Sequence, residues 1–135
     1  VKNFKMTRYG VGEIHFLEPV DLSDFNIESD VVLEPCFVNF FPYLNTKKLK
    51  EAKITGMNVP VRIKMEGVWP AAKTEDVRRR ISAINYEEAE NYSQQLQIFC
   101  NTCRATFKFY DPLMGVFCFE IPDISFGPFE IPTVN

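Results

Sequence analysis

Apolar and polar residues alternate along two stretches of the chain, and a period of two predicts strands with one buried face. The first strand is expected over 12–20, where Ile14 and Phe16 share one face. The second is expected over 59–69, in the sequence VPVRIKMEGVW. Because polar or charged residues occupy the opposite face of each strand, both fit a sheet that is packed on one side and wet on the other.

Later in the chain, apolar residues recur every three or four positions, which predicts one helix from about Tyr86 to Cys103. The expected buried stripe consists of Ala89, Tyr92, Leu96, Phe99 and Cys103. Asn85 stands where an N-cap is needed, and glutamates follow in the first turns, where the helix dipole favours them. Thr74 is a candidate cap for a second, short helix.

Two further stretches are rich in aromatic and β-branched residues. The range 31–43 is β-prone but is interrupted by Pro35 and Pro42. The range 104–121 holds two aromatic runs around DPLMG, which predicts a hairpin. Residues 45–53 are polar and fit a loop or a short helix. This order of strands, one main helix and a hairpin predicts an α+β fold with a largely antiparallel sheet.

The 135 residues suit one domain with its own core, since 46% of them are hydrophobic. The net charge of -3 and the pI of about 5.2 argue against a typical nucleic-acid-binding protein, which is basic. The one basic run, at 78–80, is interpreted as a solvated face. No apolar run reaches the roughly 18 residues of a membrane helix, and the first ten residues lack a signal-peptide core. Because the chain begins with Val1 rather than Met, we expect a fragment of a longer protein.

Cys100 and Cys103 have the CxxC spacing of some zinc and redox sites. There is no second pair of ligands, so apolar packing of the two thiols is the favoured interpretation. The single histidine, His15, falls in a predicted strand and is expected at the surface. Without a neighbouring nucleophile it makes no catalytic case. We therefore expect no metal and no cofactor.

The last strand of the predicted hairpin leads into a segment that needs its own explanation. Pro122 removes a backbone donor and stops the strand. The sequence DIS follows at 123–125, and then a tail rich in Phe and Pro. The chain therefore continues beyond the end of the last predicted strand.

Two blocks of the sequence resemble the C-terminal autoproteolytic domain of the GLFG-repeat nucleoporins, the ninety-eight-kilodalton nucleoporin family. The first block is YGVGEIHFLEPVDLSDF, and its matching residues are Gly10, Gly12, Ile14, Phe16, Leu17, Pro19, Val20 and Asp21. The second is GMNVPVRIKMEGVWPAAKT, and its matching residues are Gly56, Asn58, Gly67, Val68, Trp69, Pro70, Lys73 and Thr74. The family's tyrosine is replaced by Val11, so the chain is identified as a divergent member. Trp69 is interpreted as a core anchor that ends a strand.

The resemblance implies a β-sandwich-like core of antiparallel strands flanked by helices, over residues 1–121. It implies a component of the nuclear pore complex, in the nucleus, whose domain anchors an FG-repeat nucleoporin to the pore scaffold and supports transport of protein and mRNA. The implied partners are other nucleoporins, namely a β-propeller scaffold nucleoporin and a short nucleoporin N-terminal peptide. The resemblance also raises nucleic-acid binding, a function associated with the family. The net negative charge of this domain argues against it. A membrane is not an expected partner.

Many members of this family cut themselves at His-Phe-Ser, where the serine attacks the preceding carbonyl and histidine acts as base. Alignment of the last strand places Ser125 on the nucleophile, Ile124 on the phenylalanine and Asp123 on the histidine. A carboxyl group with a pKa of about 3.9 is a weaker base at neutral pH than an imidazole near 6.5. We therefore expect the bond before Ser125 to stay intact and the domain not to act as an enzyme. An active self-cleaving serine autoprotease is the alternative.

Residues 122–135 are expected to form a degenerate cleavage-site segment and a tail that docks on the domain. In the family that the chain resembles, the segment after the cut lies in a groove that partner peptides also occupy. Here Phe126, Phe129 and Ile131 are expected to fill that groove, by strand addition or by apolar anchoring.

Overall fold

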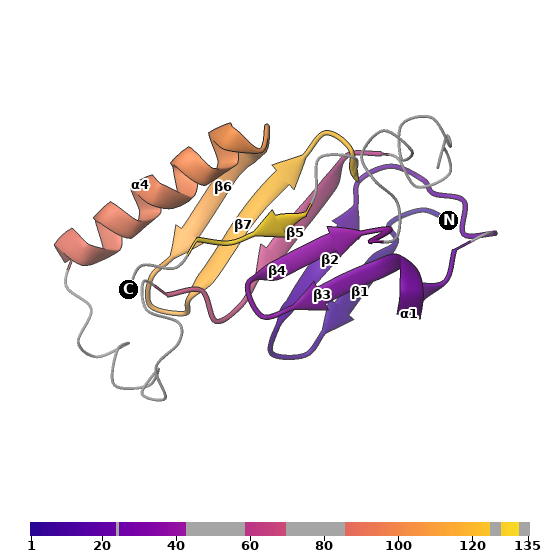
Figure 1. The fold of residues 1–135 in the computed structure, drawn as a ribbon, viewed down its shortest axis with the longest axis horizontal. Helices are drawn as coiled ribbons and strands as arrows, with labels where there is room; N and C mark the ends of the chain where they lie inside the picture. The colour runs from indigo at the N-terminus through magenta and orange to yellow at the C-terminus, as the bar shows by residue number, and fades with distance from the viewer. Residues whose placement is uncertain (24, 43–58, 70–85, 125–127, 133–135) are drawn as a thin grey trace.

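The strands form two antiparallel sheets in a computed structural model that describes residues 1–23, 25–42, 59–69, 86–124 and 128–132 (Figure 1). The five-stranded sheet has the order β1 (Lys5–Arg8), β2 (Gly12–Phe16), β5 (Val61–Met65), β7 (Val116–Ile121) and β6 (Thr106–Asp111). The three-stranded sheet has the order β3 (Val31–Glu34), β4 (Phe37–Phe40) and β8 (Phe129–Glu130). The helices of the described residues are α1 (Ile27–Asp30) and α4 (Tyr86–Thr102).

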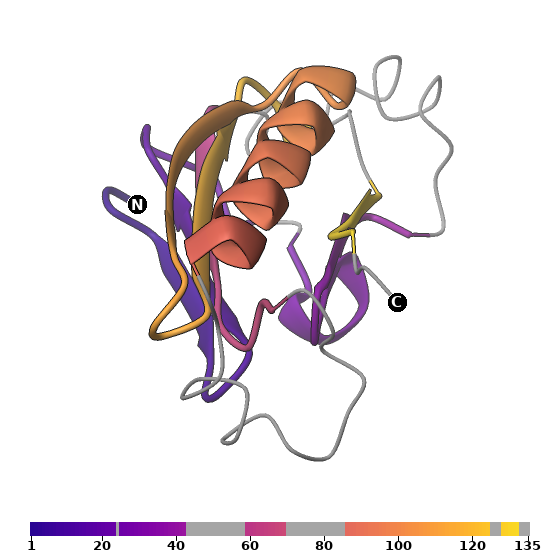
Figure 2. The same ribbon diagram turned by 90° about the vertical axis from the view of Figure 1, so that its left-hand side faces the viewer.

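The smaller sheet and helix α4 both cover the same face of the five-stranded sheet (Figure 2). Aromatic side chains fill the space between these layers. The ring centroids of Phe16 on β2 and Phe40 on β4 are 6.3 Å apart, which joins the two sheets. The rings of Phe99 on α4 and Phe119 on β7 are 5.8 Å apart, which joins the helix to the large sheet. The predicted α+β class with a sandwich-like core beside a helix is therefore confirmed.

Both alternating stretches form strands, and their apolar faces point into the core. Ile14 and Phe16 on β2 are fully buried, as are the three apolar residues of β5. The strands are shorter than the patterns predicted, since β2 ends at Phe16 and β5 covers only Val61–Met65. Downstream of β2, Pro19 has no backbone N–H to donate, so the ladder does not continue through this stretch.

The hairpin predicted at 104–121 is present, and the β-prone range that begins at Val31 forms a second hairpin from β3 and β4 that was not predicted. Each hairpin turns through a residue with positive φ. Cys36 lies between β3 and β4 with a φ of 58°. Gly115 lies between β6 and β7 with a φ of 65°, and a Cβ atom there would come within 2.5 Å of the Trp69 ring. Glycine is therefore required at 115 both by the backbone and by the ring above it. Trp69 is 8% exposed, which confirms it as a buried anchor.

Helix α4 follows the predicted stripe, with Tyr92 and Leu96 buried against the sheet. No described helix is long and apolar enough to cross a membrane. Strand β1 and the one-turn helix α1 were not predicted. Four predicted features lie outside the described residues. They are the candidate helix caps Asn85 and Thr74, the polar segment 45–53 and the basic run 78–80.

Candidate functional site

The chain after β7 returns to the domain and completes the smaller sheet. Strand β8 pairs antiparallel with β4, and Phe129 lies opposite Val38. Phe129 is 0% exposed and Ile131 is 2% exposed, so both side chains are part of the core. The Phe129 ring lies 6.5 Å from that of Phe40 and 6.1 Å from that of Phe119, between the two sheets. This segment therefore supplies core side chains as well as a strand.

Two hydrogen bonds fix the position of the segment along β4. The Ile131 amide donates to the Cys36 carbonyl at 2.9 Å. The Tyr92 hydroxyl, from helix α4, donates to the Pro132 carbonyl at 2.7 Å. Burial raises the pKa of the Tyr92 phenol, which therefore stays protonated and able to donate at neutral pH. The helix and the β3–β4 turn thus hold the segment from its two sides.

The residues aligned with the cleavage site lie between β7 and β8. Asp123 is half-buried, and Ile124 is 2% exposed, so the chain stays packed after β7 ends. Ser125 and Phe126 lie outside the described residues. The described part therefore has a half-buried carboxyl group at 123 and a buried apolar side chain at 124, the two positions that the sequence alignment matched to the motif's histidine and phenylalanine.

The single histidine lies away from this end of β7. His15 on β2 pairs with Arg62 on β5, and Arg62 in turn pairs with Glu120 on β7. Two strand spacings of about 4.8 Å each therefore separate His15 from β7. His15 is half-buried rather than a fully exposed surface residue, and its Nε2 atom is buried with no hydrogen-bond partner among the described residues.

The CxxC cysteines are packed as apolar side chains. Cys100 is 1% exposed, and burial raises its pKa to about 12. Burial also raises the pKa of Cys103, so both groups are thiols rather than the thiolates that bind metals. Among the described residues no group of three or more His, Cys, Asp or Glu side chains has the arrangement of a metal site.

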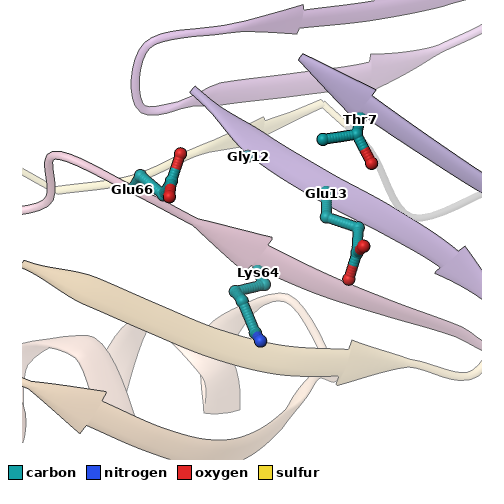
Figure 3. Close-up of a pocket in the computed structure, with 5 residues that line it drawn as sticks. All are labelled: Thr7, Gly12, Glu13, Lys64 and Glu66. Atoms are coloured by element: carbon teal, nitrogen blue, oxygen red, sulfur yellow. The ribbon is translucent and has the colours of Figure 1, made fainter. Parts of the chain in front are cut away.

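A polar hollow of about 170 Å³ lies over β1, β2 and β5 (Figure 3). It is lined by Thr7, Gly12, Glu13, Lys64 and Glu66. Glu13 and Lys64 are cross-strand neighbours whose side chains project from the face opposite the core. The hollow presents two carboxylates, one ammonium group and one hydroxyl on the outer face of the sheet, and these are the features of a solvated sheet face.

Sequence reasoning missed the residues that hold the tail segment. Tyr92 was predicted to be buried on a helix stripe, but its hydroxyl partner lies 40 residues away. Cys36 was noted only as a thiol, whereas its backbone carbonyl accepts from Ile131. A proline directly before Cys36 signalled a turn. No local pattern could show which distant strand that turn would meet.

A model of one protein family matches residues 1–126, and its description is Nucleoporin2: Nup98-96 autopeptidase S59. A curated relative, nucleoporin NUP145 of Chaetomium thermophilum, is 33% identical over 125 residues. That match covers 90% of this chain but only 6% of the relative, so this chain spans a small part of that protein's length.

Solved structures are similar over almost the whole chain. One is a mutant Nup145N APD of Chaetomium thermophilum fused to Nup145C N, with a TM-score of 0.61 and 30% identity, over 92% of this chain and 80% of that one. Another is the C-terminal domain of the nuclear pore complex component NUP116 of Candida glabrata, with a TM-score of 0.68 and 30% identity, over 91% and 76%. The yeast Nup82-Nup159-Nup116 complex gives a TM-score of 0.65 at 22% identity, over 93% and 83%, which supports the fold alone.

Proposed function

This chain belongs to the nucleoporin family of the Nup98-96 autopeptidase domain, and from that premise we propose that it anchors a nuclear pore protein to the pore scaffold by binding other nucleoporins. Its place is the nuclear pore complex, in the nucleus. As part of an FG-repeat nucleoporin, the domain would support the transport of protein and mRNA. Its partners in this proposal are a β-propeller scaffold nucleoporin and a short N-terminal nucleoporin segment.

The observation that carries the proposal is the docking of β8. The fold takes a short extended segment as the third strand of its smaller sheet, and it buries two side chains of that segment, Phe129 and Ile131. A site that binds one short strand by backbone pairing and two apolar anchors has the features of a peptide-binding groove. The Chaetomium domain that this chain resembles was itself crystallised as a fusion to Nup145C N.

In this proposal the tail of the chain occupies the groove and competes with a partner peptide. A partner peptide can then bind only the fraction of molecules whose groove is open, and this weakens the apparent affinity of the peptide. Burial of two large apolar side chains stabilises the docked tail by several kcal/mol, at about 1.5–3 kcal/mol each. Displacement of the tail therefore controls peptide binding.

The test is to bind a short N-terminal nucleoporin peptide to the intact chain and to a chain that ends at Ser125. Removal of the tail should raise the peptide affinity by about tenfold or more, because the groove is then open. Glu130→Ala, at an exposed tail position, is the matched control and should leave the affinity unchanged. Equal affinity of the intact and shortened chains would count against the competition. Failure of every candidate scaffold nucleoporin to bind the intact chain would count against the anchoring role itself.

The alternative function is self-cleavage before Ser125. The site lacks its imidazole base, because Asp123 takes that position and His15 lies two strands from β7. General-base assistance is typically worth about 10²–10⁴-fold in rate. We propose that the bond stays intact and that Ser125 is a remnant of the motif. Intact-mass measurement of the purified chain should give one uncut species, and a fragment that begins at Ser125 would establish the alternative.

A further inference from the structure

A second groove lies at the other end of the smaller sheet, away from β8. Strand β3 is the outer strand of that sheet, and β1 is the outer strand of the large sheet. Edge strands present unpaired backbone groups on which a further strand can pair. Among the described residues no strand pairs with the free edge of β3 or with that of β1.

The two edges flank a cavity of about 230 Å³. Its lining is Met6, Thr7, Arg8, Ile27, Val31 and Leu33. Most of these side chains are apolar, and Ile27 is left 56% exposed. The volume is below the roughly 300–1,000 Å³ of a small-molecule site, so it suits one or two inserted side chains.

The backbone of β3 is oriented to receive a further strand. The Phe41 amide donates to the Asp30 carbonyl, which fixes which residues of β3 bond to β4. Hydrogen-bonded and non-bonded pairs alternate along an antiparallel ladder. The backbone groups of Val31 and Leu33 therefore point away from β4, toward the groove.

The side chain of Arg8 is hydrogen-bonded to one of these outward-pointing backbone groups. Its Nη1 atom donates to the Leu33 carbonyl at 2.8 Å, across the gap between the two sheets. A guanidinium has five N–H donors, and this bond uses one of them. Within the described part of the chain, Arg8 forms no ion pair with a carboxylate. An apolar groove with a cation at its rim is complementary to an apolar side chain next to an acidic one.

We propose that this groove, separate from the tail site and from the function above, binds an extended segment of a partner protein that carries an aliphatic residue beside an aspartate or glutamate. The segment pairs with the outward groups of Val31 and Leu33. Its aliphatic side chain enters the cavity beside Ile27. Its carboxylate forms an ion pair with the Arg8 guanidinium. The Leu33 carbonyl, no longer bonded to Arg8, then accepts a hydrogen bond from a backbone N–H of the new strand.

The test is selection of a random peptide-display library on the immobilised whole chain, followed by binding measurements on the enriched peptides. The expected peptides combine aliphatic and acidic residues at alternating or adjacent positions. Synthetic versions should shift the amide NMR signals of Ile27, Val31 and Leu33. Arg8→Glu should weaken these peptides by at least tenfold and should favour versions in which lysine replaces the acidic residue.

Two controls distinguish the groove from other sites. Lys5→Glu makes the same charge change on the same strand, at an exposed residue that does not line the cavity, and should leave binding within about twofold. Ile27→Asp should weaken binding without loss of the fold, because this side chain is already 56% exposed. Enriched peptides that ignore Arg8→Glu, that shift β8 signals instead, or that fail to appear at all would each overturn the proposal.

Discussion

The smaller sheet has two edges, and the chain closes them in different ways. At the tail edge, where β8 pairs with β4, the closing segment buries Phe129 and Ile131 completely and forms backbone hydrogen bonds. At the arginine edge, where Arg8 meets β3, a single exposed side chain forms one hydrogen bond to a carbonyl. The tail edge therefore contributes side chains to the core, whereas the arginine edge is a surface contact held by one hydrogen bond.

The largest expected effect comes from removal of the tail anchor. Phe129→Ala should lower the free energy of unfolding by about 3–5 kcal/mol, since it leaves a cavity between the two sheets. Denaturant unfolding measures this change, and Glu130→Ala, exposed in the same strand, should stay within about 0.5 kcal/mol. A loss below about 1 kcal/mol for Phe129→Ala would mean that the tail does not stabilise the core as the two edges suggest.

A smaller effect is expected from Tyr92→Phe, which keeps the buried ring and removes only the hydroxyl. The Pro132 carbonyl then loses its donor, and the domain should lose about 0.5–1.5 kcal/mol of stability. Hydrogen exchange gives the more specific readout, because the Ile131 amide should exchange faster while the β3 amides do not change. Equal acceleration at both edges would show that Tyr92 acts on the whole sheet rather than on the tail edge.

Alkaline pH acts on the same contact. Burial raises the pKa of Tyr92 and of Tyr110 above the ordinary value of 10.0, so the unfolded chain releases these protons first. Their contribution is therefore fully present below about pH 10 and is lost as the pH rises through their folded-state values. Unfolding midpoints measured between pH 8 and 11 should fall above about pH 10. The unfolding midpoint should fall less steeply with pH in Tyr92→Phe, because one of the two buried phenols is gone. An identical slope would contradict the contribution of Tyr92 to this pH dependence.

The smallest effect on stability is expected at the arginine edge. Arg8→Ala should change the free energy of unfolding by less than about 1 kcal/mol, because one exposed hydrogen bond is lost. It should nevertheless increase self-association, since it uncovers an outward carbonyl on an edge strand. Sedimentation velocity at increasing protein concentration checks this, with Lys5→Ala as the matched variant. A strongly destabilised Arg8→Ala would remove the distinction between the two edges.

Local periodicity was sufficient for the strands that have one apolar and one polar face, such as β2 and β5. It missed β1 because the sequence KMTR has a single apolar residue, Met6, and pairs only once it meets β2. It missed α1 because four residues hold too few turns to show a period. The antiparallel class followed from the order of the elements, and this order does not depend on exact boundaries.

The candidate site divides in the same way. The apolar character of Phe129 and Ile131 is a local property of the sequence, whereas the expectation that they fill a groove together with Phe126 came from the resemblance to the family. Their pairing with β4 and the bond from Tyr92 depend on residues 40 or more positions away. Such contacts are set by the packing of whole layers, so no window of neighbouring residues contains them.

The pairing of β8 with β4 also determines how long β4 stays unpaired on one side during translation. Val38 on β4 pairs with Phe129, about ninety residues later in the chain. A ribosome that adds about 5–20 residues per second therefore makes β4 roughly 5–18 seconds before its closing strand exists. Throughout that interval the nascent chain carries an open β4 edge and an unfilled core, a state in which chaperones would act on it. Translation of β8 is thus the step that ends this exposure.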